Sequence, residues 1–310
     1  MVYKELGKTG MCLSNVGFGA SSLGGVFHSL NEERGCQAVE TAVEHGINFI
    51  DVSPYYGHLK AETVLGKALR RIPRDKYYLS TKVGRYGKDG VNTWDYSAER
   101  ARQSVSESME RLGVDHIDLI NVHDIEFADL EQVCGETLPA SVELLSQGQL
   151  GHVGITNLTL RHFKYVIEHV PAGTVESVLS FCHYTLNDDA LVDYLGFFEE
   201  RGIGVINASP YSMGLLTERG VPDWHPAPAA LQRLARKAVA FCKEHGVSIE
   251  RLAAHFSMNN PRIASTLFST TNPDNVIRTI EYATEPVDEA LVAEVRRIFE
   301  PGYRDTWVNS

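Results

Sequence analysis

Short, nearly continuous hydrophobic runs recur along this chain, and longer segments with apolar residues at helical spacing separate them. The runs are rich in β-branched residues, as strands buried on both faces of a parallel sheet should be. The pattern predicts eight strands, at VGFG (16–19), NFI (48–50), YYLST (77–81), HIDLINV (116–122), GHVGI (151–155), VESVLSF (175–181), IGVINA (203–208) and IASTLFS (263–269).

The segments between these runs predict helices with recognisable ends. In residues 97–113, Ser97 suits an N-cap, apolar or small residues recur on one face, and Gly113 can end the helix in the left-handed conformation. A polar opening with short runs at 3–5 and 12–14 predicts a β-hairpin before the first strand.

Eight strand–helix units favour an α/β fold, a (β/α)8 TIM barrel with an N-terminal β-hairpin and extra C-terminal helices, as a single domain over residues 1–310. A doubly wound sheet is the alternative, and its marker is a glycine-rich turn that leads directly into a helix. The stretch GFGASSLGG (17–25) is glycine-rich but lacks the G-x-G-x-x-G spacing, so we predict a loop there.

Composition narrows the choice of partners and compartment. The net charge of −11 and the absence of a basic run argue against nucleic acid and against an anionic membrane surface. The five cysteines are odd in number, widely spaced and form no CxxC, which favours a reducing compartment. The first ten residues are too polar for a signal peptide, and no apolar run approaches the ~18 residues of a membrane span. We therefore expect a cytoplasmic location.

Polar side chains stand where the predicted strands end, which is the catalytic face of such a barrel. Asp51, Tyr55 and Tyr56 follow the second strand in DVSPYYG. Lys82 ends the third strand, and His123 and Asp124 follow the fourth. Each alone is more often structural, but three consecutive strands adjoin, so their side chains can converge.

Such a convergence has a chemical use. A free tyrosine has a pKa of about 10, which is too high for easy proton transfer at neutral pH. A lysine cation at ~4 Å would favour the phenolate by about 4 kcal/mol at an effective dielectric constant of ~20, roughly three pKa units before desolvation. An aspartate would keep the lysine protonated, and a neutral histidine could donate to a substrate oxygen. This set interconverts an alcohol and a carbonyl, and hydride must come from or go to a cofactor.

The motifs DVSPYYG, LSTKVG, NVHDIE and GITNL occur in this order and resemble the aldo-keto reductase superfamily over essentially the whole chain. The resemblance implies a barrel with a bound nicotinamide cofactor and a catalytic tetrad. Carried over to this chain, the tetrad is Asp51, Tyr56, Lys82 and His123. Tyr56 takes the role of proton carrier because the tyrosine of that family directly precedes the glycine.

A closer resemblance, through HDIEF, SFCHYTLND and ASPYSMGLLTERG, is to the plant-type L-galactose dehydrogenases and related NAD-dependent aldose 1-dehydrogenases. It implies oxidation of the anomeric hydroxyl of an aldose (L-galactose or L-fucose type) to the aldonolactone. Predicted substrate contacts are Tyr55, Arg85, Trp94, His123 and Asp124. Predicted cofactor contacts are Thr156, Asn157, Ser180, Ser209, Met213, Gly214, Leu215, Leu216, Ser269, Thr270, Asn275 and Arg278.

Two positions depart from the wider superfamily. The usual glutamine of the sixth strand is missing, with Ser180 and Phe181 there instead, and Ala208 replaces the usual stacking tyrosine of the seventh. Tyr184 and Tyr211 are then the candidates to stack on the nicotinamide.

The resemblance also predicts NAD rather than NADP. Superfamily members that use NADP grip the adenosine 2′-phosphate with cations at the positions of Ser269 and Asn275, and both are uncharged here. Asp274 adds a negative charge, and Arg278 lies one turn further on. Two lost charge-assisted bonds at ~1.5–3 kcal/mol each favour NAD by at least about tenfold.

Other functions remain open from the sequence. They are a generic NADP-linked carbonyl reductase, a Schiff-base lyase that uses Lys82, and a non-catalytic redox sensor that holds a nicotinamide. No metal-binding motif such as HExxH occurs, so we predict no metal site. The sequence leaves the particular aldose and the oligomeric state undefined.

Overall fold

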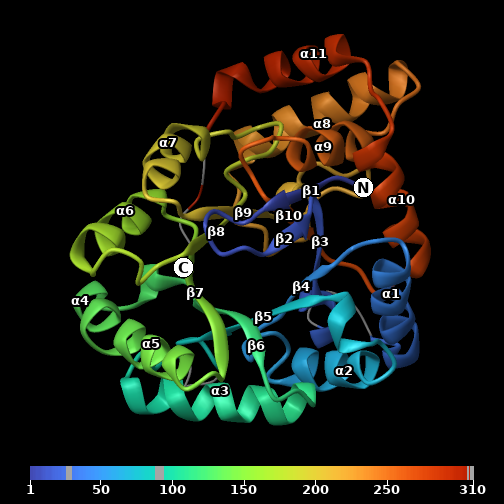
Figure 1. Ribbon diagram of the computed structural model, residues 1–310. Coiled ribbons are helices and arrows are strands. Elements are labelled where there is room, and N and C mark those ends of the chain that lie inside the picture. Colours follow the sequence, from blue (N-terminus) through green and yellow to red (C-terminus); the bar gives the residue numbers. More distant parts are fainter. Residues whose placement is uncertain (26–29, 88–93, 306, 308–310) are drawn as a thin grey trace.

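A computed structural model of the chain describes residues 1–25, 30–87, 94–305 and 307. Eight parallel strands close into a barrel in the order β10-β3-β4-β5-β6-β7-β8-β9 (Figure 1). They are β3 (Val16–Gly19), β4 (Phe49–Asp51), β5 (Tyr78–Val83), β6 (Ile117–Val122), β7 (Leu150–Asn157), β8 (Ser177–Phe181), β9 (Gly204–Ala208) and β10 (Ser265–Phe268). All eight predicted strands and the predicted (β/α)8 fold are confirmed.

The predicted N-terminal hairpin is also present, as β1 (Tyr3–Glu5) paired with β2 (Cys12–Ser14). Its residues Leu6, Met11 and Leu13 pack on the lowest layer of side chains inside the barrel, which includes Phe49 and Leu119. The hairpin therefore closes the end of the barrel where the strands begin (Figure 1).

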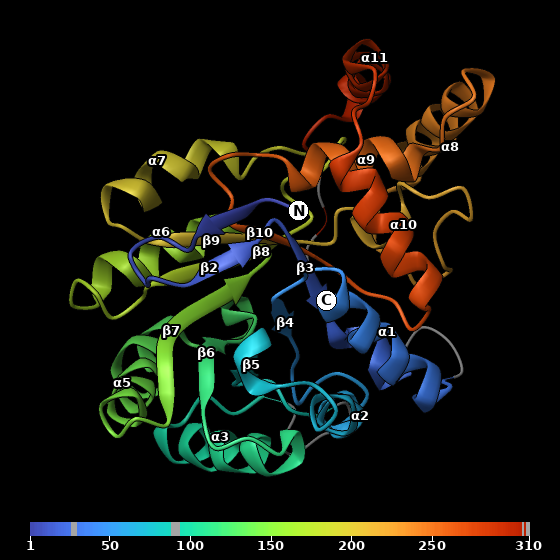
Figure 2. The same ribbon diagram turned by 45° about the vertical axis from the view of Figure 1, so that its right-hand side comes forward.

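Helices surround the barrel, mostly one after each strand. They are α1 (Glu32–Glu44), α2 (Lys60–Leu69), α3 (Ala98–Leu112), α4 (Leu130–Gln132), α5 (Leu138–Ser146), α6 (Leu160–His169), α7 (Val192–Glu200), α8 (Ala229–Glu244), α9 (Ile249–Met258), α10 (Pro273–Thr284) and α11 (Glu289–Phe299). Figure 2 shows α8 and α11 outside the ring of helices that covers the sheet, which confirms the extra C-terminal helices.

The helix ends follow local chemistry that the sequence revealed. Ser97 caps α3 by accepting a hydrogen bond from the Arg100 amide, and Gly113 ends it with φ of 72°. A π-helical turn, Val133–Thr137, joins α4 to α5. No sequence signal had predicted that turn.

Strand residues alternate between the barrel interior and the helix layer. Phe49, Leu119 and Leu179 face inward, whereas Val178 and Ile155 pack against the helices. This alternation decides which polar residues near the strand ends can share the mouth of the barrel.

The described part of the chain has neither a membrane-spanning helix nor a cluster of metal-binding side chains. No helix there is both long and apolar enough to cross a membrane. Within the same ranges, no three His, Cys, Asp or Glu side chains gather closely enough to hold a metal ion.

Candidate active site

The four residues of the predicted tetrad come together where β4, β5 and β6 end. Asp51 and Lys82 belong to neighbouring strands, His123 follows β6, and Tyr56 lies in the loop after β4. The Lys82 Nζ atom lies 4.9 Å from the centroid of the Tyr56 ring. The Tyr56 and His123 ring centroids are 5.8 Å apart. The structure thus places a phenol, an ammonium, a carboxyl and an imidazole side by side.

Lys82 and Asp51 form a buried ion pair, with 1% and 3% of their side chains exposed. Lys82 also donates to the Val52 carbonyl at 2.8 Å. Burial by itself lowers the pKa of Lys82, but its interactions with Asp51, and to a smaller extent with Tyr56, outweigh burial and leave that pKa above its ordinary value. Burial raises the pKa of Asp51, and Lys82 opposes the rise. A lysine that stays protonated is a poor nucleophile, which argues against the Schiff-base lyase.

Tyr56 and His123 are held in their neutral forms. Burial raises the pKa of Tyr56, and the Lys82 charge opposes this only in part. The Lys82 cation lowers the pKa of Tyr56, as expected from the sequence, but burial raises that pKa by more, so the phenol stays protonated. Burial, and then the charges of Lys82 and Arg85, hold the pKa of His123 well below its ordinary value. The Nδ1 atom of the neutral His123 ring lies 3.0 Å from the Ser53 hydroxyl oxygen.

The loop that carries Tyr56 is fixed by a close backbone contact. A Cβ atom at Gly57 would lie 2.1 Å from the Gly24 carbonyl oxygen, and Gly57 has φ of +61°. Gly24 ends the 3-10 helix Ala20–Gly24, so the glycine-rich stretch of the sequence supports the Tyr56 loop. The predicted loop thus contains a 3-10 turn, and the next helix among the described residues, α1, begins at Glu32.

Aromatic rings surround an arginine beside this set. The Arg85 guanidinium lies 3.6 Å from the Tyr55 ring centroid and 4.3 Å from that of Trp94. It also forms an ion pair with Asp124 at 2.5 Å. Phe127, which the sequence analysis did not single out, stacks on Trp94 at 4.2 Å. The predicted substrate contacts therefore share one rim.

Asp124 links this rim to the tetrad. Its Oδ2 atom lies 3.5 Å from His123 Nε2, and its amide donates to Thr156 Oγ1 at 3.2 Å. Burial raises the pKa of Asp124, and the Arg85 charge opposes that rise.

Three predicted cofactor contacts lie on β7 and β8. Because side chains alternate along a strand, Thr156 points into the barrel, whereas Asn157 and Ser180 are on the same side as Ile155 and Val178, which pack against the helices. Asn157 accepts from the Glu126 amide at 2.9 Å and donates to the Thr159 carbonyl at 2.9 Å. The geometry directs neither Asn157 nor Ser180 into the mouth.

The loop after β9 has an unusual backbone. Ser209 and Met213 have φ of 59° and 56°, values uncommon for residues with a side chain. Gly214 follows with φ of 106°. Leu215 and Leu216 are buried in the cluster that contains α8, so their side chains are not available to a ligand. Strain of this kind gathers at functional loops, which agrees with a binding role for the backbone here.

The residues predicted to bind the adenosine part of the cofactor lie at the start of α10. Ser269 is exposed and bonds the amide and the hydroxyl of Ser22 at 2.9 and 2.8 Å. Thr270 accepts from the Asn275 side chain at 3.3 Å, and Arg278 is exposed one turn further on. Asn272 caps α10, as predicted.

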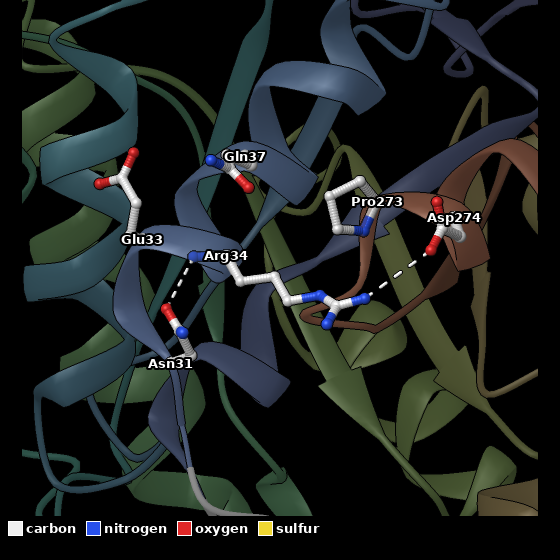
Figure 3. Close-up of a pocket in the computed structure, with 6 residues that line it drawn as sticks. All are labelled: Asn31, Glu33, Arg34, Gln37, Pro273 and Asp274. Atoms are coloured by element: carbon white, nitrogen blue, oxygen red, sulfur yellow. Dashed lines mark hydrogen bonds and ion pairs between the residues drawn. The ribbon is translucent and has the colours of Figure 1, made fainter.

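Arg34 of α1 reaches the same place, in a hollow between α1 and α10 (Figure 3). Its Nη2 atom lies 2.9 Å from Asn272 Oδ1 and 3.7 Å from Asp274 Oδ2. Sequence reasoning missed this cation because it stands 238 positions before Asn272.

The other side of the mouth is apolar and partly accessible, formed by Phe181 and Ala208 at the ends of β8 and β9. Tyr184 stacks on Phe256 of α9 at 4.8 Å, and the Tyr211 hydroxyl faces α10, so neither ring is directed to this surface. The described acid–base residues move protons but supply no electrons. An apolar surface beside proton-transfer groups fits a nicotinamide ring.

Comparison with known proteins agrees with this chemistry. A sequence profile described as the Aldo/keto reductase family matches residues 15–300. L-galactose dehydrogenase of Arabidopsis thaliana is 44% identical to this chain and covers 98% of it, with 96% of that protein matched. D-threo-aldose 1-dehydrogenase of a Pseudomonas species is 28% identical, with 92% of this chain and 94% of that protein matched.

Among solved structures, aldo-keto reductase AKR11C1 from Bacillus halodurans in its holo form matches with a TM-score of 0.79. The match covers 100% of this chain and 99% of that one, at 23% sequence identity. At that identity the likeness concerns the fold alone.

Proposed function

The chain belongs to the aldo/keto reductase family of nicotinamide-dependent oxidoreductases that act on CH–OH groups, and on that premise we propose that it oxidises the anomeric hydroxyl of a free aldose to the aldonolactone, with NAD as the preferred cofactor.

The convergence of Tyr56, Lys82, Asp51 and His123 supports this reaction most directly. His123, which burial keeps neutral, can donate a hydrogen bond to the C1 oxygen of the sugar. Tyr56 takes the hydroxyl proton in its phenolate form, which the Lys82 cation stabilises. Because burial raises the pKa of Tyr56, oxidation should accelerate as the pH rises into the alkaline range. A bound nicotinamide would accept the hydride that leaves C1.

The rim residues support a sugar as the substrate. Arg85 and Asp124 offer charged donors and acceptors for ring hydroxyls, and Tyr55, Trp94 and Phe127 offer apolar faces next to them. The relatives named L-galactose dehydrogenase and D-threo-aldose 1-dehydrogenase match over nearly their whole lengths. We therefore favour L-galactose, or L-fucose with its similar configuration.

The preference for NAD rests on the charges near α10. Ser269 and Asn275 carry no charge, and Asp274 would repel a 2′-phosphate. Arg34 could counter that repulsion, but it already bonds Asn272 and lies next to Asp274. A 2′-phosphate would have to draw Arg34 away from these partners, and its existing contacts therefore favour NAD.

A panel of free aldoses with NAD or NADP, followed by the absorbance of the reduced nicotinamide, tests the proposal. We expect the highest kcat/KM with L-galactose or L-fucose and NAD. Faster turnover of simple aldehydes with a reduced cofactor would instead indicate a general carbonyl reductase. Cofactor binding without turnover of any compound in the panel would indicate a redox sensor.

A further inference from the structure

A chain of hydrogen bonds lies behind Asp51, on the side away from Lys82. The second carboxyl oxygen of Asp51 accepts a bond from the Ser80 hydroxyl at 2.9 Å. The Ser80 oxygen in turn accepts from the Asn121 side-chain amide at 3.0 Å. Ser80 and Asn121 are both fully buried inside the barrel, on β5 and β6. The chain therefore runs from the acid–base groups into the interior.

Packing alone does not require polar side chains at these positions. Two residues earlier, the inner faces of β5 and β6 carry Tyr78 and Leu119, which belong to an apolar cluster. Ser177, on the inner face of β8, is also buried, yet its hydroxyl finds no hydrogen-bond partner among the described residues. A buried serine in this barrel therefore does not always find a hydrogen-bond partner, and the two hydrogen bonds of the Ser80 hydroxyl depend on the particular positions of Asp51 and Asn121.

A neighbouring glycine leaves room for this arrangement. A Cβ atom at Gly154 on β7 would lie 2.4 Å from the Asn121 side-chain oxygen and 2.4 Å from the Ser177 hydroxyl oxygen. Any larger residue there would displace the Asn121 amide, which donates to Ser80.

We propose that Ser80 and Asn121 are positioning residues for the oxidation, which hold Asp51 with one oxygen on Lys82 and the other on the Ser80 hydroxyl. The inference rests on the proposed function, because it concerns the same proton-transfer groups. Without Ser80, the second oxygen of Asp51 would be buried with no partner and would take up a proton more readily. Lys82 would then lose the negative charge that holds its proton against burial, and a neutral lysine would no longer stabilise the Tyr56 phenolate.

Other charged and titratable groups face this set and titrate with it. Tyr56 lies beside Lys82, and His123 follows β6 next to Asp124, which Arg85 neutralises. The single change of a serine hydroxyl leaves all of them in place. Its effect on a pH profile therefore reports on Asp51 and the groups coupled to it.

The test compares Ser80→Ala with Ser177→Ala, the same chemical change in the same barrel. For Ser80→Ala we expect kcat to fall about tenfold or more, and the acid limb of the pH–rate profile to move up by about one pH unit. The dissociation constant for NAD should not change. Ser80→Thr, which keeps the hydroxyl, should restore most of the rate, and Asn121→Ala should shift the profile in the same direction by less. Ser177→Ala should match the parent.

A profile for Ser80→Ala that superimposes on the parent overturns the proposal, and so does an equal shift in Ser177→Ala. If the parent oxidises no aldose, the proposed function fails, and a measurement without substrate then decides on the positioning role. The Tyr56 phenol is titrated by ultraviolet difference absorbance, each protein against the same protein with Tyr56→Phe. Ser80→Ala should raise its pKa, and an unchanged value overturns the proposal.

Discussion

Replacement of Lys82 by methionine should lower both the stability of the fold and the activity, and a second change at Asp51 should restore the stability alone. The change leaves Asp51 buried without its cation, in a place where both side chains were almost fully enclosed. Removal of one partner from a buried ion pair typically costs about 3–5 kcal/mol in the free energy of unfolding. A double variant, Lys82→Met with Asp51→Asn, has no charge left to bury, and its amide can still bond Ser80. We expect the double variant to recover most of the lost stability and none of the activity.

The pH dependence of the single variant has a definite sign. Burial already raises the pKa of Asp51, and loss of Lys82 removes the main opposing charge, so that pKa rises further. Between the ordinary pKa and this raised one, the unfolded chain ionises while the folded chain keeps its proton, so stability falls as the pH rises. The deficit of Lys82→Met should therefore shrink from about pH 8 to about pH 5.

Urea denaturation followed by circular dichroism measures these differences at each pH. An exposed ion pair provides the matched control, since Arg262 and Glu199 have 40% and 51% of their side chains exposed. Arg262→Met should stay close to the parent because solvent screens such pairs. A Lys82→Met protein as stable as the parent at about pH 8, or with a deficit that acid does not reduce, would refute the reasoning.

Two further changes test the proton carrier and the cofactor. Tyr56→Phe should lower kcat by about 10²–10⁴-fold without weaker NAD binding, because only the acidic hydroxyl is lost; a rate within a few-fold of the parent, or an equal loss in Tyr55→Phe, would contradict the assignment. The parent should have at least about tenfold higher kcat/KM with NAD than with NADP, and Ser269→Lys with Asn275→Arg should raise the NADP value. Equal values in the parent would mean that Arg34 or Arg278 supplies the missing charge.

The parts of the fold that the sequence predicted correctly depend on local chemistry. The β-branched runs, the Ser97 cap and the Gly113 terminus act over a few residues, so their pattern was sufficient. The convergence of the tetrad was also predictable, because the strands that carry Asp51 and Lys82 are consecutive.

Features that depend on distant contacts could not be predicted in the same way. Ser80 and Asn121 looked like ordinary strand residues, and only the closed barrel shows that Asn121 donates to Ser80 and that Ser80 donates to Asp51. The position of Arg34 against Asp274 requires the packing of α1 on α10. Short motifs also do not reveal the partners of a strand residue, and the hydrogen bonds of Asn157 to the Glu126 amide and the Thr159 carbonyl appear only in the folded barrel.

The hairpin β1–β2 also has a consequence for the order of events during turnover. By packing Leu6 and Leu13 under the strands, it leaves the opposite end as the route to Lys82 and His123. The sugar and the nicotinamide cofactor would both use this entrance, and neither could pass the other inside it. If one of them lies behind the other in the mouth, the deeper one has to bind first and leave last, and we then expect an ordered kinetic scheme. Product-inhibition patterns, rather than equilibrium affinities, would then reflect the presence of these three-residue strands.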